Sequence, residues 1–318
     1  MKWLKMLGRI VAALVLALGA AWGVAIWQAN RDVEPVSLAD RQASFQRAIG
    51  WFKANEPGIL QEGNSALWWM VQVAAERSQD AYLLALTRES VKRSYPADGP
   101  ALAWKRMVVP HAEVAPVDLS TIDPLEDYQR FFLHGLACQP LPLAQGDTSR
   151  MLRENICTPL LFKVWPGDPV CSTHHAMGLA LFKRTACPVP PETAHLNQVV
   201  LDDIAFQTQY DILMRDAYIQ HVLTLMWLRG PEAVKPIWMR RVLAQQQQDG
   251  GWRGHKIYPF LPDALQPWSI HLLLKAWWPS RFPTISDPVD FHASAQGLLL
   301  MALSLPEQAK SQNGLTAN

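Results

Sequence analysis

The sequence predicts an all-α protein in which one N-terminal membrane-spanning helix precedes a helical domain. Three observations lead to this prediction. An uncharged apolar run covers residues 10–27, and beyond it apolar residues recur at helical spacing through most of the chain. Alternation with a period of two never persists long enough to indicate a strand. The chain has 318 residues, enough to bury a sizeable core after the N-terminal segment.

The N-terminal segment predicts the compartment. Residues 1–9 contain Lys2, Lys5 and Arg9, and the apolar run 10–27 would rise about 27 Å as a helix, nearly the thickness of the hydrocarbon layer. Basic residues before such a run keep the N-terminus in the cytoplasm. We therefore expect a cytoplasmic tail at 1–9, a signal anchor in the inner membrane at 10–27 and a periplasmic or otherwise extracytoplasmic domain. A cleaved secretory signal is the alternative, although no A-x-A site ends the run.

Residues 28–37 form a short polar stretch that we interpret as a linker, and residues 38–318 as the exported helical domain. Proline and glycine divide this domain into successive helices. The expected helices cover 38–55, 65–77, 79–93, a short segment around Trp104, 125–138, 172–184, 197–229, 231–248, 264–278 and 290–305. The 197–229 stretch should break near Tyr210, because a helix longer than about thirty residues is unusual in a compact domain.

Composition and motifs exclude several classes of protein. The 29 basic and 28 acidic residues give a formal net charge of +1, and no basic run follows the N-terminal segment, so we expect no nucleic-acid partner. The sequence contains no G-x-S-x-G elbow, no phosphate-binding Walker loop and no dinucleotide fingerprint.

The cysteines indicate an oxidising compartment. All four lie in one window of about fifty residues, and an even number in an exported chain predicts two disulfides. A helix over 172–184 would hold its ends roughly 20 Å apart, too far for a Cys171–Cys187 bridge. Cys138 and Cys187 both follow the last turn of an expected helix, so the preferred pairing is Cys138–Cys187 with Cys157–Cys171. Four free buried thiols are the alternative.

Three expected helices share a similar opening. Residues 173–181 and 291–299 each begin with a turn that contains histidine and continue with small residues and a leucine-rich face, and 216–221 begins a third helix of this kind. Small residues allow neighbouring helices to pack closely around a centre. This repetition favours an α/α toroid, a barrel of alternating outer and inner helices.

One local motif supports the same architecture. Gln246, Gly250 and Trp252 form a Q-x-x-x-G-x-W pattern at the end of an expected helix. This pattern resembles the repeat of the terpenoid cyclase and prenyltransferase-like α/α toroids, and the resemblance implies that the glutamine caps a helix end and stacks on the tryptophan. The catalytic motifs of that family are absent: residues 201–204 read Leu-Asp-Asp-Ile where a cyclase has D-x-D-D, and no D-D-x-x-D diphosphate motif occurs. The motif therefore predicts architecture, not chemistry.

In a toroid the N-terminal ends of the inner helices face one mouth of the barrel. The residues expected to meet there as candidate catalytic groups are His174, His175, Asp216 and His292. Such a set could bind zinc through two or three histidines and a carboxylate, or act in general acid–base catalysis. The candidate substrate-binding residues that would orient these groups are Tyr218, Gln220 and Gln296. The alternative is that each histidine caps its own helix or fills a polar place in the core.

Two functions are compatible with these residues and with the membrane anchor. The first is a membrane-anchored envelope enzyme, a hydrolase or lyase acting on a polymeric or lipid-linked substrate. The second is a non-catalytic binding or assembly factor that presents a groove to an envelope partner. Convergence of the His/Asp set within about 8 Å would favour the enzyme, and scatter would favour the binding protein. The sequence names neither the substrate nor the partner.

Overall fold

The computed structural model describes residues 2–95, 102–113, 132, 135–138, 171–188, 193–211, 216–252 and 291–307. Over these residues the protein is all-helical, with no strand and with a single isolated bridge between Gln246 and Trp252. The helices are α1 (Lys2–Asn30), α2 (Leu38–Ile59), α3 (Ser65–Ser78), α4 (Ala81–Ser94), α5 (Leu102–Val108), α9 (Cys171–Arg184), α10 (Thr193–Tyr210), α11 (Asp216–Leu228), α12 (Pro236–Gln245) and α14 (Phe291–Ser304). The expected helix at 264–278 lies outside the described residues, as does most of the one at 125–138.

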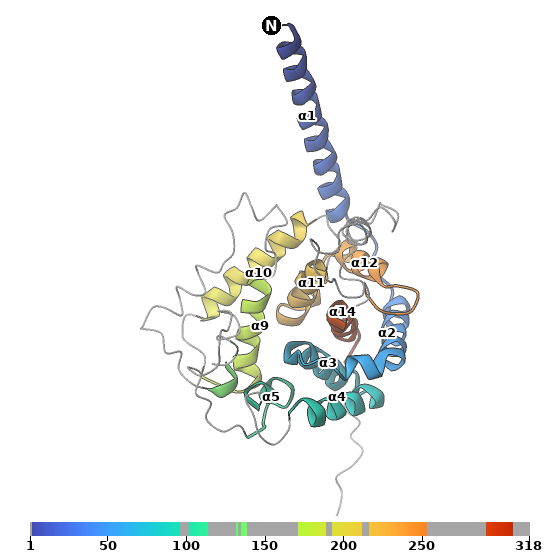
Figure 1. Ribbon diagram of the computed structural model, residues 1–318, viewed down its shortest axis with the longest axis vertical. Helices are drawn as coiled ribbons and strands as arrows, with labels where there is room; N and C mark the ends of the chain where they lie inside the picture. The colour runs from blue at the N-terminus through green and yellow to red at the C-terminus, as the bar shows by residue number, and fades with distance from the viewer. Residues whose placement is uncertain are drawn as a thin grey trace, which may run out of the picture.

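Helix α1 projects away from the remaining helices (Figure 1). Its segment Lys5–Asn30 contains an 18-residue window with a mean hydropathy of 2.3 and no buried residue, so by length and composition it can cross a membrane. Large apolar side chains such as Leu16 and Trp27 are 74% and 66% exposed, so α1 presents an apolar surface.

The last residue of α1 joins this helix to the domain. The Asn30 side chain donates from Nδ2 to the carbonyl oxygen of Gln209 at 2.6 Å, and its Oδ1 accepts from Trp238 Nε1 at 3.2 Å. These bonds reach the end of α10 and the first turn of α12. Residues 31–37 then lead to α2 without helix, and Val33 and Val36 pack partly buried against the core.

Helix α14 lies in the middle of the domain and packs against α3, α11 and α2 (Figure 1). Twelve of its residues are buried, which explains why its sequence is apolar on nearly every face. Around it, α3 also packs against α4 and α5, while α11 packs against α9, α10 and α12. The expected break near Tyr210 is confirmed, since α10 ends at that residue.

Two helix boundaries differ from the expected ones for identifiable reasons. The helix expected over 231–248 begins only at Pro236, because proline suits the first helical turn and breaks an interior. A short 3₁₀ turn, Pro231–Ala233, precedes it. Conversely, α2 continues through Pro57 to Ile59 instead of closing at Asn55. Burial of Ile59 and Leu60 in the core accounts for the extra turn.

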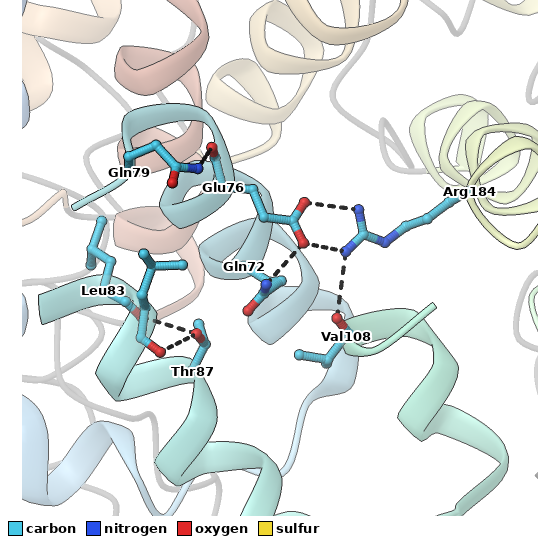
Figure 2. A network of polar contacts seen from close by, with 8 residues as sticks. Gln72, Glu76, Gln79, Leu83, Thr87, Val108 and Arg184 are labelled. Atoms are coloured by element: carbon cyan, nitrogen blue, oxygen red, sulfur yellow. Dashed lines mark hydrogen bonds and ion pairs between the residues drawn. The ribbon is translucent and has the colours of Figure 1, made fainter. Parts of the chain in front are cut away.

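Polar contacts lock the C-terminal end of α9 onto α3 and α5 (Figure 2). Both terminal nitrogens of Arg184 reach the Glu76 carboxylate, at 3.2 and 3.3 Å, and Gln72 donates to the same carboxylate at 2.8 Å. Arg184 also donates to the carbonyl oxygen of Val108 at 3.4 Å. A bidentate arginine sets the direction of approach as well as the contact, so this network orients α9.

The predicted Cys138–Cys187 pairing is confirmed, with the two Cα atoms 5.0 Å apart. Both cysteines follow a helical turn, and Thr185 Oγ1 donates to the carbonyl oxygen of Gly135 at 2.7 Å beside the bridge. The bridge therefore ties residues 135–138 to the end of α9. Cys157 lies outside the described residues, so the Cys157–Cys171 pairing stays a prediction.

The turn after α12 joins this helix to α2 through Gln246. Its Oε1 accepts from Ser44 Oγ at 2.8 Å and from Arg47 at 2.6 Å, while its Nε2 donates to the carbonyl oxygens of Ser44 and Gly250, both at 2.9 Å. Ser44 and Arg47 belong to α2. The Gln246 amide therefore accepts two hydrogen bonds and donates two, so both of its polar atoms are satisfied.

Trp252 completes the same turn and is fully buried. Its indole Nε1 donates to the carbonyl oxygen of Val242 at 2.9 Å, and its backbone N–H donates to Ser294 Oγ at 3.0 Å, which connects α12 to α14. Gly250 has a φ of +98°, and a Cβ there would lie 2.1 Å from the carbonyl oxygen of Arg47. A Cβ on Gly297 would lie 2.5 Å from the Trp252 ring. Only glycine fits at these two places.

Candidate functional site

A cavity of about 420 Å³ lies where the N-terminal portions of four helices meet. The described residues that line it come from the start of α3 and the turn before it, from α5, α9, α11 and α14, and from position 132: Gly63, Asn64, Ser65, Ala66, Leu67, Met70, Trp104, Phe132, His174, Met177, Gln220 and His292. Gly63 and Asn64 are exposed, so the cavity opens to solvent beside them. Its size suits one small molecule or one unit of a larger molecule.

The opening of α3 forms one wall of the cavity. Asn64 caps this helix by accepting a hydrogen bond from the backbone N–H of Ala66 at 3.0 Å. His174, Gln220 and His292 stand in the first two turns of α9, α11 and α14. Helical side chains lean toward the N-terminus of their own helix, which directs these three toward a shared space.

His174 is largely buried, and its pKa is lowered to about 4. Burial is the main cause, and the neighbouring positive charges of His292 and then His175 add to it. The imidazole is therefore neutral at pH 7, and in this form it can donate one hydrogen bond and accept another. The Phe132 ring meets its edge at a centroid distance of 6.3 Å.

Gln296 stands one turn beyond His292 on α14. Its Nε2 lies 3.3 Å from Nε2 of His292, and the Gln296 side chain is fully buried. A buried amide in contact with the ring restricts the orientation of the imidazole at the cavity wall.

Gln220 brings an unused polar group to the cavity. Its side chain is 2% exposed, its Nε2 donates to Met177 Sδ at 3.8 Å, and its Oε1 has no hydrogen-bond partner among the described residues. A thioether is a weak acceptor, so this buried amide gains little from the protein. A buried polar group left in this way costs stability unless water or a ligand satisfies it.

The other predicted site residues lie elsewhere or have only their backbone described. His175 is buried, at 2% exposure, and does not line the cavity. Tyr218 is fully buried beneath the Arg241 guanidinium, 4.0 Å from its ring centroid, and burial is the main reason that the Tyr218 pKa is raised. Asp216 is the first residue of α11, and its side chain lies outside the described part.

The cavity thus brings together three of the residues predicted for the site and leaves others out. His174, His292 and Gln220 line the cavity, while His175 and Tyr218 belong to the core. In the described ranges no three His, Cys, Asp or Glu side chains lie close enough to hold a metal ion. The zinc site expected from the sequence needs at least three ligands. Among the described residues, the cavity has two of them, the imidazoles of His174 and His292.

The contribution of α3 was not anticipated from the sequence. Residues Gly63, Asn64 and Ser65 form the turn and cap that open this helix, yet they contain no histidine and did not resemble the other openings. Trp104 and Phe132 supply the aromatic part of the wall. A comparison of every helix N-terminus, rather than of those with histidine, would have identified α3.

Comparison with known proteins adds no identification: no family model matches the chain, and no curated protein or solved structure matches it. Function is therefore inferred from the geometry of the cavity and from the N-terminal helix.

Proposed function

We propose that this is a membrane-anchored protein of the cell envelope whose helical domain binds a small polar ligand in the cavity between α3, α9, α11 and α14. The observation that carries this proposal is the convergence of His174, His292 and Gln220 on one solvent-accessible cavity of about 420 Å³. Imidazole and amide groups beside an apolar wall are typical of sites that bind and orient a ligand.

We propose an α/α toroid as the architecture, with α3, α9, α11 and α14 as inner helices. The packing of α4 on α3, of α10 on α9 and α11, and of α2 on α14 supports this arrangement, since each proposed inner helix has an outer neighbour. The connection that Gln246 and Trp252 make between α12, α2 and α14 supports the resemblance to the terpenoid cyclase-like toroids. The absence of that family's catalytic motifs argues against its chemistry.

We propose that α1 anchors the protein in the inner membrane, with the domain in the periplasm. The length and apolar surface of α1 support the anchor, and the basic residues at 2–9 support a cytoplasmic N-terminus. The Cys138–Cys187 bridge supports an oxidising compartment for the domain. Fusion of a reporter that is active only outside the cytoplasm to Asn318 should give an active reporter in the membrane fraction; an inactive one would contradict this topology.

An enzyme is the second candidate function, and the pair His174 and His292 is the observation that favours it. Gln296 orients His292 as a general base is oriented in acid–base catalysis. Against catalysis by His174 stands its pKa of about 4, because an imidazole with so low a pKa is a weak base at pH 7. A binding role is therefore the better supported of the two.

A pair of glycine variants tests the binding function. Gly63 is exposed at the cavity mouth and a Cβ there meets nothing within 4 Å, so Gly63→Trp should obstruct the cavity without disturbing the fold. Gly58 has the same open surroundings in α2 and lies away from the cavity, which makes Gly58→Trp the matched control. The full-length proteins would be purified in detergent micelles and compared by thermal unfolding.

The probes are phosphate, acetate, glycerol, glucose, alanine and N-acetylglucosamine. A ligand at about 100 times its Kd stabilises the protein by about 2.7 kcal/mol. We expect at least one probe to raise the Tm of the wild type and of Gly58→Trp but not of Gly63→Trp. If no probe acts, or if every effective probe acts equally on all three proteins, the binding proposal is wrong. Conversion of an effective probe, detected by mass spectrometry and lost in His292→Ala, would favour the enzyme.

A further inference from the structure

We propose that the ligand is anionic, and that its carboxylate or phosphate group is held where the N-terminal portions of α3, α9, α11 and α14 meet. This inference rests on the binding function proposed above and adds the chemical class of the ligand. It is carried by helix direction, by the charge of the lining and by the state of Gln220.

Residues from the first two turns of four helices line the cavity, so the positive ends of four helix dipoles lie close to it. α3, α9 and α14 each have 14 residues and α11 has 13, so each is long enough to develop a dipole. A helix N-terminus carries the equivalent of about half a positive charge, together with backbone N–H groups that lack a partner within the helix. The ends of four such helices around one cavity favour a negative ligand.

The described lining contains no carboxylate to neutralise this potential. Its polar side chains are those of Asn64, Ser65, His174, Gln220 and His292, each of which can donate a hydrogen bond. Glu62 is next to the lining in sequence, but it is exposed and does not line the cavity.

Gln220 supplies an independent indication of a ligand. It is 2% exposed, it lines the cavity, and its Oε1 has no partner in the described part of the chain. The only acceptor that its Nε2 meets there is the sulfur of Met177. Rotation of the amide by half a turn would therefore sacrifice one weak bond and direct the NH₂ group at an anion.

The two histidines fit the same ligand. The positive charge of His292 lowers the pKa of His174, after the larger effect of burial. An anion beside both rings would attract protons to them, which would convert them into donors of charge-assisted hydrogen bonds.

The apolar part of the cavity wall indicates the chemistry of the rest of the ligand. Leu67, Met70, Trp104, Phe132 and Met177 are apolar and line the same cavity. We therefore infer a small amphiphilic anion, either free or as the headgroup of a lipid, in which an apolar portion adjoins the charged group.

Two substitutions of Ala66 separate charge from size. Ala66 lies in the first turn of α3 and lines the cavity. Ala66→Glu would place a tethered carboxylate there, and an acidic residue in a first helical turn is compatible with folding. Ala66→Gln has nearly the same volume without the charge and is the matched control.

The experiment is isothermal titration of the full-length protein in detergent micelles. The anionic probes are phosphate, acetate and dihexanoyl phosphatidic acid, and the neutral probes are glycerol and glucose. We expect at least one anionic probe to bind the wild type, and Ala66→Glu to weaken that binding at least tenfold more than Ala66→Gln. Binding of phosphate or acetate alone would indicate a free anion, whereas binding of the phosphatidic acid alone would indicate a lipid headgroup.

Three results would overturn the inference. In the first, neutral probes bind, Gly63→Trp abolishes that binding, and no anion binds. This result would refute the anionic ligand and leave the binding function intact. Equal weakening by Ala66→Glu and Ala66→Gln would also refute it. If no probe of either charge binds, the proposed function falls together with the inference.

Discussion

Two glutamines show how differently this molecule uses the same side chain. In the turn after α12, Gln246 makes four hydrogen bonds, to Ser44, Arg47 and Gly250. At the cavity, Gln220 has one weak contact with Met177, and its oxygen has no partner among the described residues. The two amides have the same chemistry and differ in how completely the protein satisfies them.

The difference separates a structural turn from the proposed binding site. A satisfied amide contributes about 1 kcal/mol for each hydrogen bond, whereas an unsatisfied buried one costs about 1–3 kcal/mol. The turn therefore stabilises the packing of α12, α2 and α14. The cavity is maintained at a cost in stability, as is common where a site must remain available to a ligand.

The largest expected effect comes from the tryptophan of the turn. Trp252→Ala should destabilise the protein by about 3–5 kcal/mol, because the side chain is fully buried and its loss leaves a large void. Trp104→Ala, at the partly exposed cavity wall, should cost less than half as much. Urea unfolding of both variants measures the difference, and equal losses would mean that the two regions do not differ in packing.

Acidification should weaken the cavity region through His174. The histidine in the unfolded chain takes up a proton near pH 6.5, whereas in the folded protein its pKa is lowered to about 4. The unfolded state therefore binds more protons as the pH falls from 6.5 to 4, and the free energy of unfolding should decrease by up to about 3 kcal/mol over this range.

Unfolding measured across that pH range in the wild type and in His174→Gln tests this expectation. The variant should show a flatter dependence on pH, while His111→Gln, at an exposed position, should follow the wild type. Identical profiles for the wild type and His174→Gln would show that burial does not disfavour the charged form of this histidine.

Removal of the amide from the turn should be clearly destabilising. Gln246→Leu leaves the carbonyl oxygens of Ser44 and Gly250 without their donor, so we expect a loss of about 2–3 kcal/mol. Gln248→Leu, two residues away and exposed, should change stability by less than about 0.5 kcal/mol. Thermal unfolding compares the two, and a neutral Gln246→Leu would remove the basis for treating the turn as a structural element.

The corresponding glutamine-to-leucine substitution at the cavity should have a small effect on stability, without the loss expected for Gln246→Leu. Gln220→Leu replaces a buried amide that lacks a partner for its oxygen, so stability should stay unchanged or rise by about 1 kcal/mol. Ligand binding, measured by titration, should weaken at least tenfold. A loss of stability like that of Gln246→Leu would show that Gln220 is structural and would break the comparison.

Much of the local structure could be predicted from the sequence because it depends on neighbouring residues. The apolar run 10–27 predicted α1, and helical periodicity predicted most of the helices to within a few residues. The position of Cys138 and Cys187 just after two expected helices led to the correct Cys138–Cys187 pair. Errors occurred where burial overrode a local signal, as at Pro57, whose helix continues so that Ile59 can enter the core.

The candidate site was predicted only in part, because adjacent residues on a helix point in different directions. His174 and His175 are neighbours in sequence, but about 100° of helical rotation separates their side chains. His174 reaches the cavity, and His175 is buried away from it. Tyr218 and Gln220 are separated on α11 in the same manner, with Tyr218 beneath Arg241 and Gln220 at the cavity.

The sequence by itself determined the helical class, the long apolar N-terminal helix and the spacing of the two bridged cysteines, since these follow from periodicity, composition and helix rise. Only the tertiary structure decided that the opening of α3 joins those of α9, α11 and α14, that Gln246 is satisfied, and that the Gln220 oxygen has no partner in the described part. The physical reason is that a hydrogen bond or a cavity depends on which helices pack together, and that packing brings together residues more than a hundred positions apart in the chain.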